Sequence, residues 1–148
     1  MSIYIHKSHN VNVIIYHIVC PTKYRRVVID KSVEKIIKQT CLAIAQRYDM
    51  HFLEIGADQD HVHFLIQSVP MMLPTRIVQA VKSITAKQVF KQAPQVKKQL
   101  WGGEFWSDGY YISTVGKHSS EQAVSKYVKE QGTEKEYVKI HKDQLKLF

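Results

Sequence analysis

The sequence predicts an α+β domain in which an antiparallel sheet carries its helices on one face. Segments with strand-like and helix-like hydrophobic patterns follow one another in the order β, α, β, β, α, β, α. Two of the strand-like segments are separated by a stretch short enough for a hairpin. The chain has 148 residues and no Gly/Ser-rich linker, so we expect a single domain over residues 1–148.

The first half of the chain shows the clearest element pattern. Residues 11–20 are apolar on both parities, which is typical of a strand buried on both sides. Asp30 is placed to cap a first helix, whose apolar positions recur over 33–48. Two short strand-like segments follow at about 51–57 and 61–69, and the stretch between them has a hairpin-like composition.

The second half predicts two more helices and a further strand pair. A helix is expected over about 74–94, where prolines stand at both ends. Aromatic and β-branched residues at 105–115 surround Asp108-Gly109, a pattern of strand, turn and strand. A capping box predicts a third helix over about 119–131, and the Lys-rich residues 133–148 are expected to form a C-terminal tail.

The composition narrows the function classes. Lys and Arg number 21 against 13 Asp and Glu, and the resulting net charge of +8 favours a polyanionic partner, above all nucleic acid. A basic surface without a specific partner is the open alternative. No apolar run approaches the roughly 18 residues of a membrane-spanning helix. The 2 cysteines are too few for a disulfide scaffold and suit a reducing cytoplasm, where we expect the protein to act.

The sequence Asp60-His61-Val62-His63 carries the sharpest local pattern. Alternate side chains of a strand share a face, so His61 and His63 should point the same way while Val62 points to the other layer. Two such imidazoles can hold one divalent cation. A pair of partly buried, hydrogen-bonded histidines is the alternative, and for an isolated pattern of this kind it is the more common one.

A second set of polar side chains lies in the third predicted helix. Val124, Tyr127, Val128 and Gln131 have the spacing of one helical face. A Tyr hydroxyl, a Gln oxygen and two imidazoles could then converge. A phenol with a pKa of about 10 needs an activated electrophile, which a metal beside a phosphate supplies. The donor set N, N, O suits Mg²⁺ or Mn²⁺. An ordinary core tyrosine and a polar helix-end glutamine are the alternative.

The order of these motifs resembles the HUH-type single-tyrosine transposases of small bacterial insertion sequences, the IS200-like group, which act on single-stranded DNA. The motifs that carry the resemblance are spread over most of the chain, and they are His17-Ile18-Val19, Lys23-Tyr24-Arg25-Arg26, residues 60–63, Val81-Lys82-Ser83, residues 106–116 and residues 127–131. The resemblance implies a ferredoxin-like or RRM-like HUH endonuclease core with a catalytic tyrosine on a C-terminal helix.

The resemblance also implies a set of roles. His61, His63 and Gln131 would bind the metal, Mg²⁺ or Mn²⁺, and Tyr127 would be the nucleophile that forms a 5′-phosphotyrosine link to DNA. Members of the family are homodimers that bind hairpins at the ends of the element, with the active site completed in trans. The chain departs from the family at residues 84–87, where other members often carry a basic turn.

Further side chains are expected to support DNA binding and the metal site. Arginine and lysine beside a strand end or on the second predicted helix are suited to phosphate contacts. The candidates are Lys23, Arg25, Arg26, Lys82 and Lys87. Glu54 and Asp60 are candidate carboxylates that orient the imidazoles. For each of these side chains, a solvated surface position is the alternative.

Two other functions are compatible with the same residues. One is a domesticated protein that binds DNA hairpins without cutting them, although such a protein has no need of the histidine pair and the tyrosine. The other is a metal-dependent phosphoesterase that activates water rather than a tyrosine.

Overall fold

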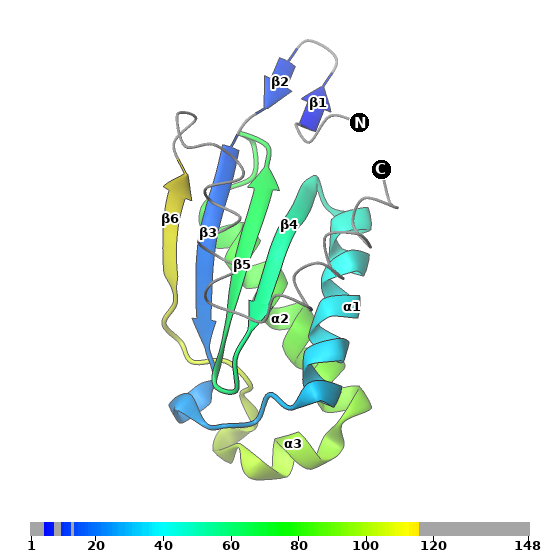
Figure 1. Cartoon of the computed structure of the whole chain (residues 1–148), viewed down its shortest axis with the longest axis vertical. Helices are drawn as coiled ribbons and strands as arrows, with labels where there is room; N and C mark the ends of the chain where they lie inside the picture. The colour runs from blue at the N-terminus through cyan, green and yellow to red at the C-terminus, as the bar shows by residue number, and fades with distance from the viewer. Residues whose placement is uncertain (1–4, 8–9, 13, 116–148) are drawn as a thin grey trace.

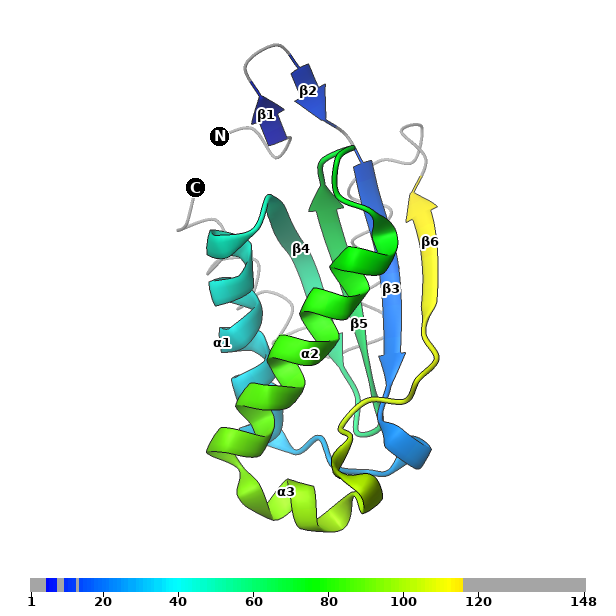
Figure 2. The same cartoon turned by 180° about the vertical axis from the view of Figure 1, so that it is seen from behind.

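The computed structural model describes residues 5–7, 10–12 and 14–115. Their centre is an antiparallel sheet of four strands in the order β4-β5-β3-β6. The strands are β3 (Ile14–Pro21), β4 (Met50–Ala57), β5 (His61–Ser68) and β6 (Tyr111–Val115). Helices α1 (Lys31–Arg47) and α2 (Pro74–Gln92) cover one face of this sheet, as the two opposite views show (Figures 1 and 2). The predicted fold class is therefore confirmed.

Shorter elements complete the described part. Strands β1 (Ile5–Lys7) and β2 (Asn10–Asn12) pair with each other in a separate two-stranded sheet. A 3₁₀ turn η1 (Lys23–Arg25), the short helix α3 (Pro94–Gln99) and a second 3₁₀ turn η2 (Trp101–Gly103) lie in the connections. Within the described ranges, no helix has the length and apolar character needed to cross a membrane.

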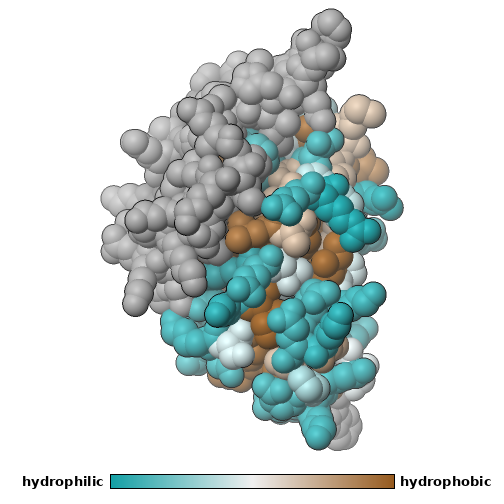
Figure 3. All heavy atoms as spheres, turned by 90° about the vertical axis from the view of Figure 1, so that its right-hand side faces the viewer, coloured by the Kyte–Doolittle hydropathy of each residue, from teal (hydrophilic) through white to brown (hydrophobic). Residues whose placement is uncertain are grey.

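The main core lies between the helices and the sheet. Val62, Phe64 and Ile66 of β5 point to this side and are fully buried. The Asp30 side chain accepts a hydrogen bond from the backbone N–H of Val33 over 2.8 Å, so the predicted cap of the first helix is confirmed. The opposite side of α1 faces outward, and hydrophilic side chains predominate among the described residues seen from there (Figure 3).

The long apolar run near the N-terminus divides into two strands, which differs from the single strand expected over 11–20. Ile14 of β3 pairs with Ser68, which is the last residue of β5. The main sheet therefore offers no partner on β5 beyond this point, and the preceding strand β2 pairs with β1 instead.

The strand–turn–strand prediction for residues 105–115 was wrong in its first half. Trp106 forms an isolated antiparallel bridge with Thr22, and only β6 continues as a strand, beside β3. The buried indole of Trp106 donates its Nε1–H to Oγ1 of Thr85 over 2.9 Å, which holds this segment against α2. Asp108 and Gly109 consequently lie in a connection and not in a hairpin turn.

The remaining predictions concern residues beyond Val115. The third helix over 119–131, the tail 133–148, Tyr127 and Gln131 all lie outside the described residues. The extent of a single domain over 1–148 stays a prediction.

Candidate functional site

The histidine pair lies on the sheet face opposite the helices. His61 is the first residue of β5 and His63 follows on the same face, while Val62 between them is buried in the helix-side core. The two imidazole rings are 4.8 Å apart between centroids, with an angle of 75° between their planes. The alternation expected from the sequence therefore places both imidazoles side by side.

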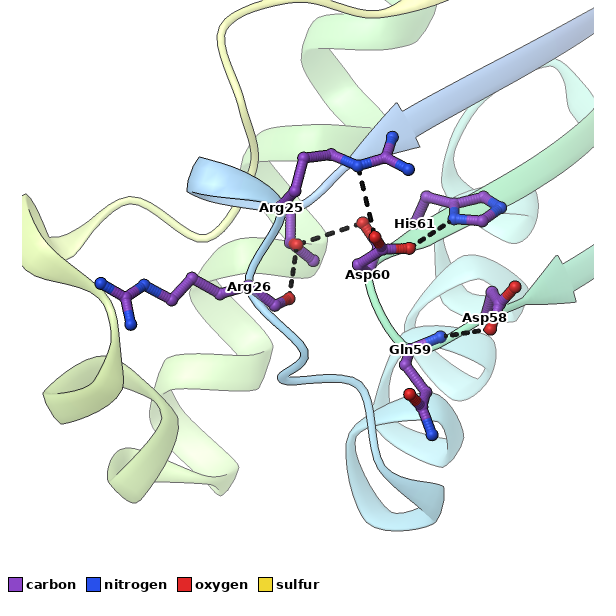
Figure 4. Close-up of polar contacts among 7 residues, drawn as sticks. Arg25, Arg26, Asp58, Gln59, Asp60 and His61 are labelled. Atoms are coloured by element: carbon purple, nitrogen blue, oxygen red, sulfur yellow. Dashed lines mark hydrogen bonds and ion pairs between the residues drawn. The ribbon is translucent and has the colours of Figure 1, made fainter.

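Asp60 fixes the orientation of the first imidazole. Nδ1 of His61 lies 2.7 Å from Oδ1 of Asp60 (Figure 4). This hydrogen bond lowers the pKa of the Asp60 carboxyl, so the group is a carboxylate near neutral pH and can only accept. In neutral His61 the ring proton is consequently on Nδ1, and Nε2 carries a lone pair.

Arg25 extends this arrangement towards the basic turn. Its Nε lies 3.3 Å from Oδ2 of Asp60, so one carboxylate bridges a guanidinium and an imidazole (Figure 4). The Arg25 side chain is 60% exposed, and the pair is therefore a weak source of stability. The effect of the Arg25–Asp60 pair is to hold the guanidinium cation beside His61.

The second imidazole is held by another histidine. Nδ1 of His63 lies 3.2 Å from Nε2 of His17, which belongs to the adjacent strand β3. Nε2 of His63 is buried and has no hydrogen-bond partner among the described residues. Burial lowers the pKa of His63 to about 4, so its imidazole is neutral near pH 7, as a metal ligand must be.

The described part of the site supplies two nitrogen donors for a metal. It contains no group of three or more His, Cys, Asp or Glu side chains that could hold an ion. The unpartnered Nε2 of His63 and the Nε2 of His61 fit a divalent ion that accepts imidazole. The third donor expected from the sequence, Gln131, lies outside the described residues.

The two candidate carboxylates occupy different positions. Asp60 contacts His61 directly. Glu54 is fully buried in β4 and pairs with Leu65, the residue two positions after His63. For Glu54, a role in orienting an imidazole stays a prediction.

Besides Arg25, which is paired with Asp60, two more of the five candidate DNA-binding residues have their charges engaged within the protein. Nζ of Lys23 lies 2.7 Å from Oε2 of Glu104, a hydrogen bond that raises the pKa of Lys23. Nζ of Lys82 donates to the backbone carbonyls of Ser107 and Asp108 over 2.6 and 3.3 Å. Both ammonium groups therefore anchor the segment before β6.

The other three candidates are exposed. Arg25, Arg26 and Lys87 all lie at the surface, and the Arg26 side chain points away from Asp60 (Figure 4). The turn that carries the arginines is strained, because Tyr24 and Arg25 have φ values of 58° and 53°, in a region that non-glycine residues rarely adopt. Tyr24 in this turn is 63% exposed.

His17 also lies on this sheet face, and the sequence alone did not assign it to the site. Its motif contributed to the resemblance, but its role was left open. The available signal is a histidine within an otherwise apolar strand, at a position whose parity places it on the face away from the helices. Its contact with His63, 46 residues away in sequence, is visible only in the fold.

The fold is that of known transposases. The crystal structure of a Deinococcus radiodurans R1 protein described as a transposase superposes with a TM-score of 0.68 at 26% identity, covering 86% of this chain and 97% of that one. A REP-associated tyrosine transposase bound to a REP hairpin superposes with a TM-score of 0.55 over 88% of this chain and 70% of that one. At 9% identity, the second likeness concerns the fold alone.

The sequence gives the family. Residues 10–131 match the family described as "Transposase IS200 like", so the chain belongs to the IS200-like transposases. It is 32% identical over 116 residues to the ISDra2 transposase TnpA of Deinococcus radiodurans, covering 78% of this chain and 82% of that one. It is 28% identical to the transposase for insertion sequence element IS200 of Salmonella typhimurium, covering 78% and 75%. The resemblance inferred from the motifs is confirmed.

Proposed function

We propose that this transposase recognises hairpins at the ends of an insertion sequence and that it cleaves and rejoins single-stranded DNA through Tyr127. The observation that carries the proposal is the pair His61 and His63. Both rings have a hydrogen-bond partner at Nδ1, and they lie side by side on the same sheet face.

The metal site of the proposal consists of His61, His63 and Gln131. A Mg²⁺ or Mn²⁺ ion held there would polarise a phosphoryl oxygen and neutralise the charge that develops during displacement. The protein contributes two imidazoles whose orientation is set before an ion binds. Asp60 holds the first, and the resulting fixed geometry favours binding because little ordering remains to be done.

The covalent step is a displacement at phosphorus. The Tyr127 hydroxyl loses its proton as its oxygen forms a bond to the phosphorus, the bond from phosphorus to the 3′ oxygen breaks, and that oxygen takes up a proton and leaves as a 3′-hydroxyl. The product is a 5′-phosphotyrosine. In the joining step another 3′-hydroxyl attacks the same phosphorus and releases Tyr127 as a phenol, so the number of phosphodiester bonds is conserved and no ATP is needed.

The partner in this proposal is single-stranded or hairpin DNA. The net charge of +8 and the exposed Arg25, Arg26 and Lys87 support binding of phosphates. We propose a homodimer in which the helix carrying Tyr127 completes the partner's site. We also propose a cytoplasmic location, which suits the two free, buried cysteines Cys20 and Cys41.

A covalent-adduct assay tests the function. End-labelled hairpin oligonucleotides are incubated with the full chain and Mn²⁺ or Mg²⁺, and the products are separated under denaturing conditions. The expected result is a protein–DNA adduct that disappears with Tyr127→Phe and weakens with His61→Ala. An adduct that persists in Tyr127→Phe contradicts the assignment of the nucleophile.

The same assay separates the other functions. Hairpin binding without any adduct identifies a non-cutting DNA-binding protein. Cleaved DNA without a covalent intermediate identifies a phosphoesterase that uses water. Both outcomes are distinguishable from transposition because only the tyrosine mechanism retains the 5′ phosphate on the protein.

A further inference from the structure

His17 is a buried polar residue for which the proposed chemistry has no use. It lies in β3, in the middle of the sheet, and only 6% of it is exposed. It belongs to the same sheet face as His63, which is its diagonal neighbour on β5 because His63 pairs with Val19. Its contact with His63 therefore follows from the register of the two strands.

The two rings form an edge-to-edge hydrogen bond. Their planes are only 13° apart, and Nε2 of His17 lies 3.2 Å from Nδ1 of His63. The centroids are 5.5 Å apart, which exceeds the distance between the nitrogens by about two ring radii, so the two nitrogens point at each other along the line that joins the rings. A bond of this geometry fixes the rotation of the His63 ring.

We infer that His17 is a positioning residue that accepts the Nδ1 proton of His63 and thereby keeps the Nε2 lone pair of His63 available to a divalent cation. This inference rests on the proposed metal site. Asp60 gives His61 the same tautomer through its carboxylate. The two imidazoles then offer the same nitrogen to one ion, although one is oriented by an acid and the other by a neutral ring.

The opposite tautomer explains less of the structure. If His17 donated to Nδ1 of His63, the proton of His63 would be on Nε2, where no described residue accepts it. A buried N–H without an acceptor costs about 1–3 kcal/mol. The tautomer with the proton on Nδ1 instead uses the donor in a hydrogen bond and leaves a lone pair at the buried nitrogen, which a metal ion can satisfy.

The surroundings of His17 hold it in place. The Tyr111 ring of β6 contacts the His17 ring edge-on, with 6.0 Å between centroids and an angle of 70°. His17 also pairs in register with Ser113 of β6 and with Leu65 of β5. The acceptor therefore lies on the central strand, between two neighbours, and not on a loop.

The decisive measurement is the tautomer of His63 in the metal-free protein, read from the ¹⁵N chemical shifts of the imidazole nitrogens. In the wild-type protein we expect the proton on Nδ1. In His17→Leu, which has no acceptor, the proton should move towards Nε2, the preferred position in free histidine. In His17→Gln, whose Oε1 takes the place of the ring nitrogen, the Nδ1 proton should be retained.

Mn²⁺ affinity, measured by calorimetry without DNA, provides the second readout. His17→Leu should weaken binding about 10- to 100-fold, the usual effect of losing a partner of a ligating histidine, and His17→Gln should restore most of it. His51→Leu, which removes another half-buried histidine from the sheet, is the matched control and should change neither readout.

Two results overturn the inference: a His63 proton on Nε2 in the wild-type protein, or an unchanged tautomer and Mn²⁺ affinity in a folded His17→Leu variant. The tautomer measurement requires neither metal nor DNA, and it does not depend on the chemistry of Tyr127. Failure of the adduct assay would therefore contradict the proposed function, whereas the inference about His17 would still be tested by the tautomer of His63.

Discussion

Oδ1 of Asp60 lies 2.7 Å from Nδ1 of His61, and the carboxylate thereby determines which nitrogen of the first histidine faces the proposed metal site. The second carboxylate oxygen is 3.3 Å from Nε of Arg25. One acidic side chain therefore connects the strained basic turn to the histidine pair. The sequence motif places an acid next to His61, and the structure shows that the two side chains are in contact.

Removing this carboxylate should weaken metal binding. We expect Asp60→Ala to lower Mn²⁺ affinity about 10- to 100-fold, because His61 loses the partner that fixes its ring and its tautomer. Asp60→Asn keeps an oxygen acceptor without the charge and should lie between Asp60→Ala and the wild-type protein. The measurement is calorimetric titration of the metal-free protein with Mn²⁺.

Asp58 provides the control for this series. It is also an acid in the β4–β5 turn, but its side chain accepts a hydrogen bond from the backbone N–H of Gln59 over 2.8 Å (Figure 4). Asp58→Ala removes the same charge from the same turn and should change the affinity much less. Equal losses in the Asp58 and Asp60 variants would show that net charge, and not orientation of His61, governs binding.

The histidine pair and its carboxylate were predictable because they are local. Alternation along a strand places His61 and His63 on one face whatever the rest of the fold does, and a side-chain cap such as Asp30 depends on only the next few residues. The fold class followed from the same short-range periodicities.

The errors and the omission involve distant partners. Residues 105–115 have the composition of a hairpin, but Trp106 pairs with Thr22 and bonds to Thr85, neither of which is near it in sequence. The role of His17 depends on a register between β3 and β5 that no local pattern reveals. Long-range pairing overrides turn composition in these places.

A second prediction concerns stability, at Thr85. Its Oγ1 donates to the Val81 carbonyl and also accepts from the buried indole of Trp106. Thr85→Val leaves the indole N–H without its acceptor and should destabilise the protein by about 1–3 kcal/mol in urea unfolding. Thr85 lies within residues 84–87, where the resemblance led us to expect a basic turn, and its burial and its bond to Trp106 give this segment a packing role.

Thr40 is the matched control for Thr85. Its hydroxyl donates to the Ile36 carbonyl one helical turn back, in the same manner as Thr85, but it accepts no hydrogen bond from another described residue. Thr40→Val should therefore lower the free energy of unfolding less than Thr85→Val does. The double variant Thr85→Val with Trp106→Phe has no unpaired indole N–H. Its loss in unfolding free energy should therefore be smaller than the sum of the losses in the two single variants.

A third prediction distinguishes exposed cations from engaged ones in DNA binding. Arg26→Ala and Lys87→Ala each remove an exposed charge, and each should lower the salt dependence of hairpin affinity by about one unit of slope. Lys82→Ala removes an ammonium that is bonded to two carbonyls and should change the slope less, while lowering stability. Fluorescence anisotropy over a salt series measures the slopes, and equal slopes in all three variants would contradict the distinction.

A fourth prediction concerns pH and the buried thiol of Cys20. Burial raises the pKa of Cys20 from an ordinary 9.0 to about 12. The folded protein therefore keeps this proton at pH values where the unfolded chain loses it, and stability must fall as the pH rises through the window between about 9 and about 12. In this window the thiol contributes a loss of up to about 1.4 kcal/mol per pH unit.

Comparison with Cys20→Ala isolates this contribution from other groups that titrate in the same range. The variant loses buried volume at every pH, but it has no thiol to ionise. Its deficit in unfolding free energy relative to the wild-type protein should accordingly shrink as the pH rises above 9. Ile18→Val, another small truncation on the same face of β3, should show a constant deficit. Urea unfolding at pH 8 to 10.5 measures the three curves, and parallel curves for wild type and Cys20→Ala would mean that the thiol is already ionised or accessible in the folded state.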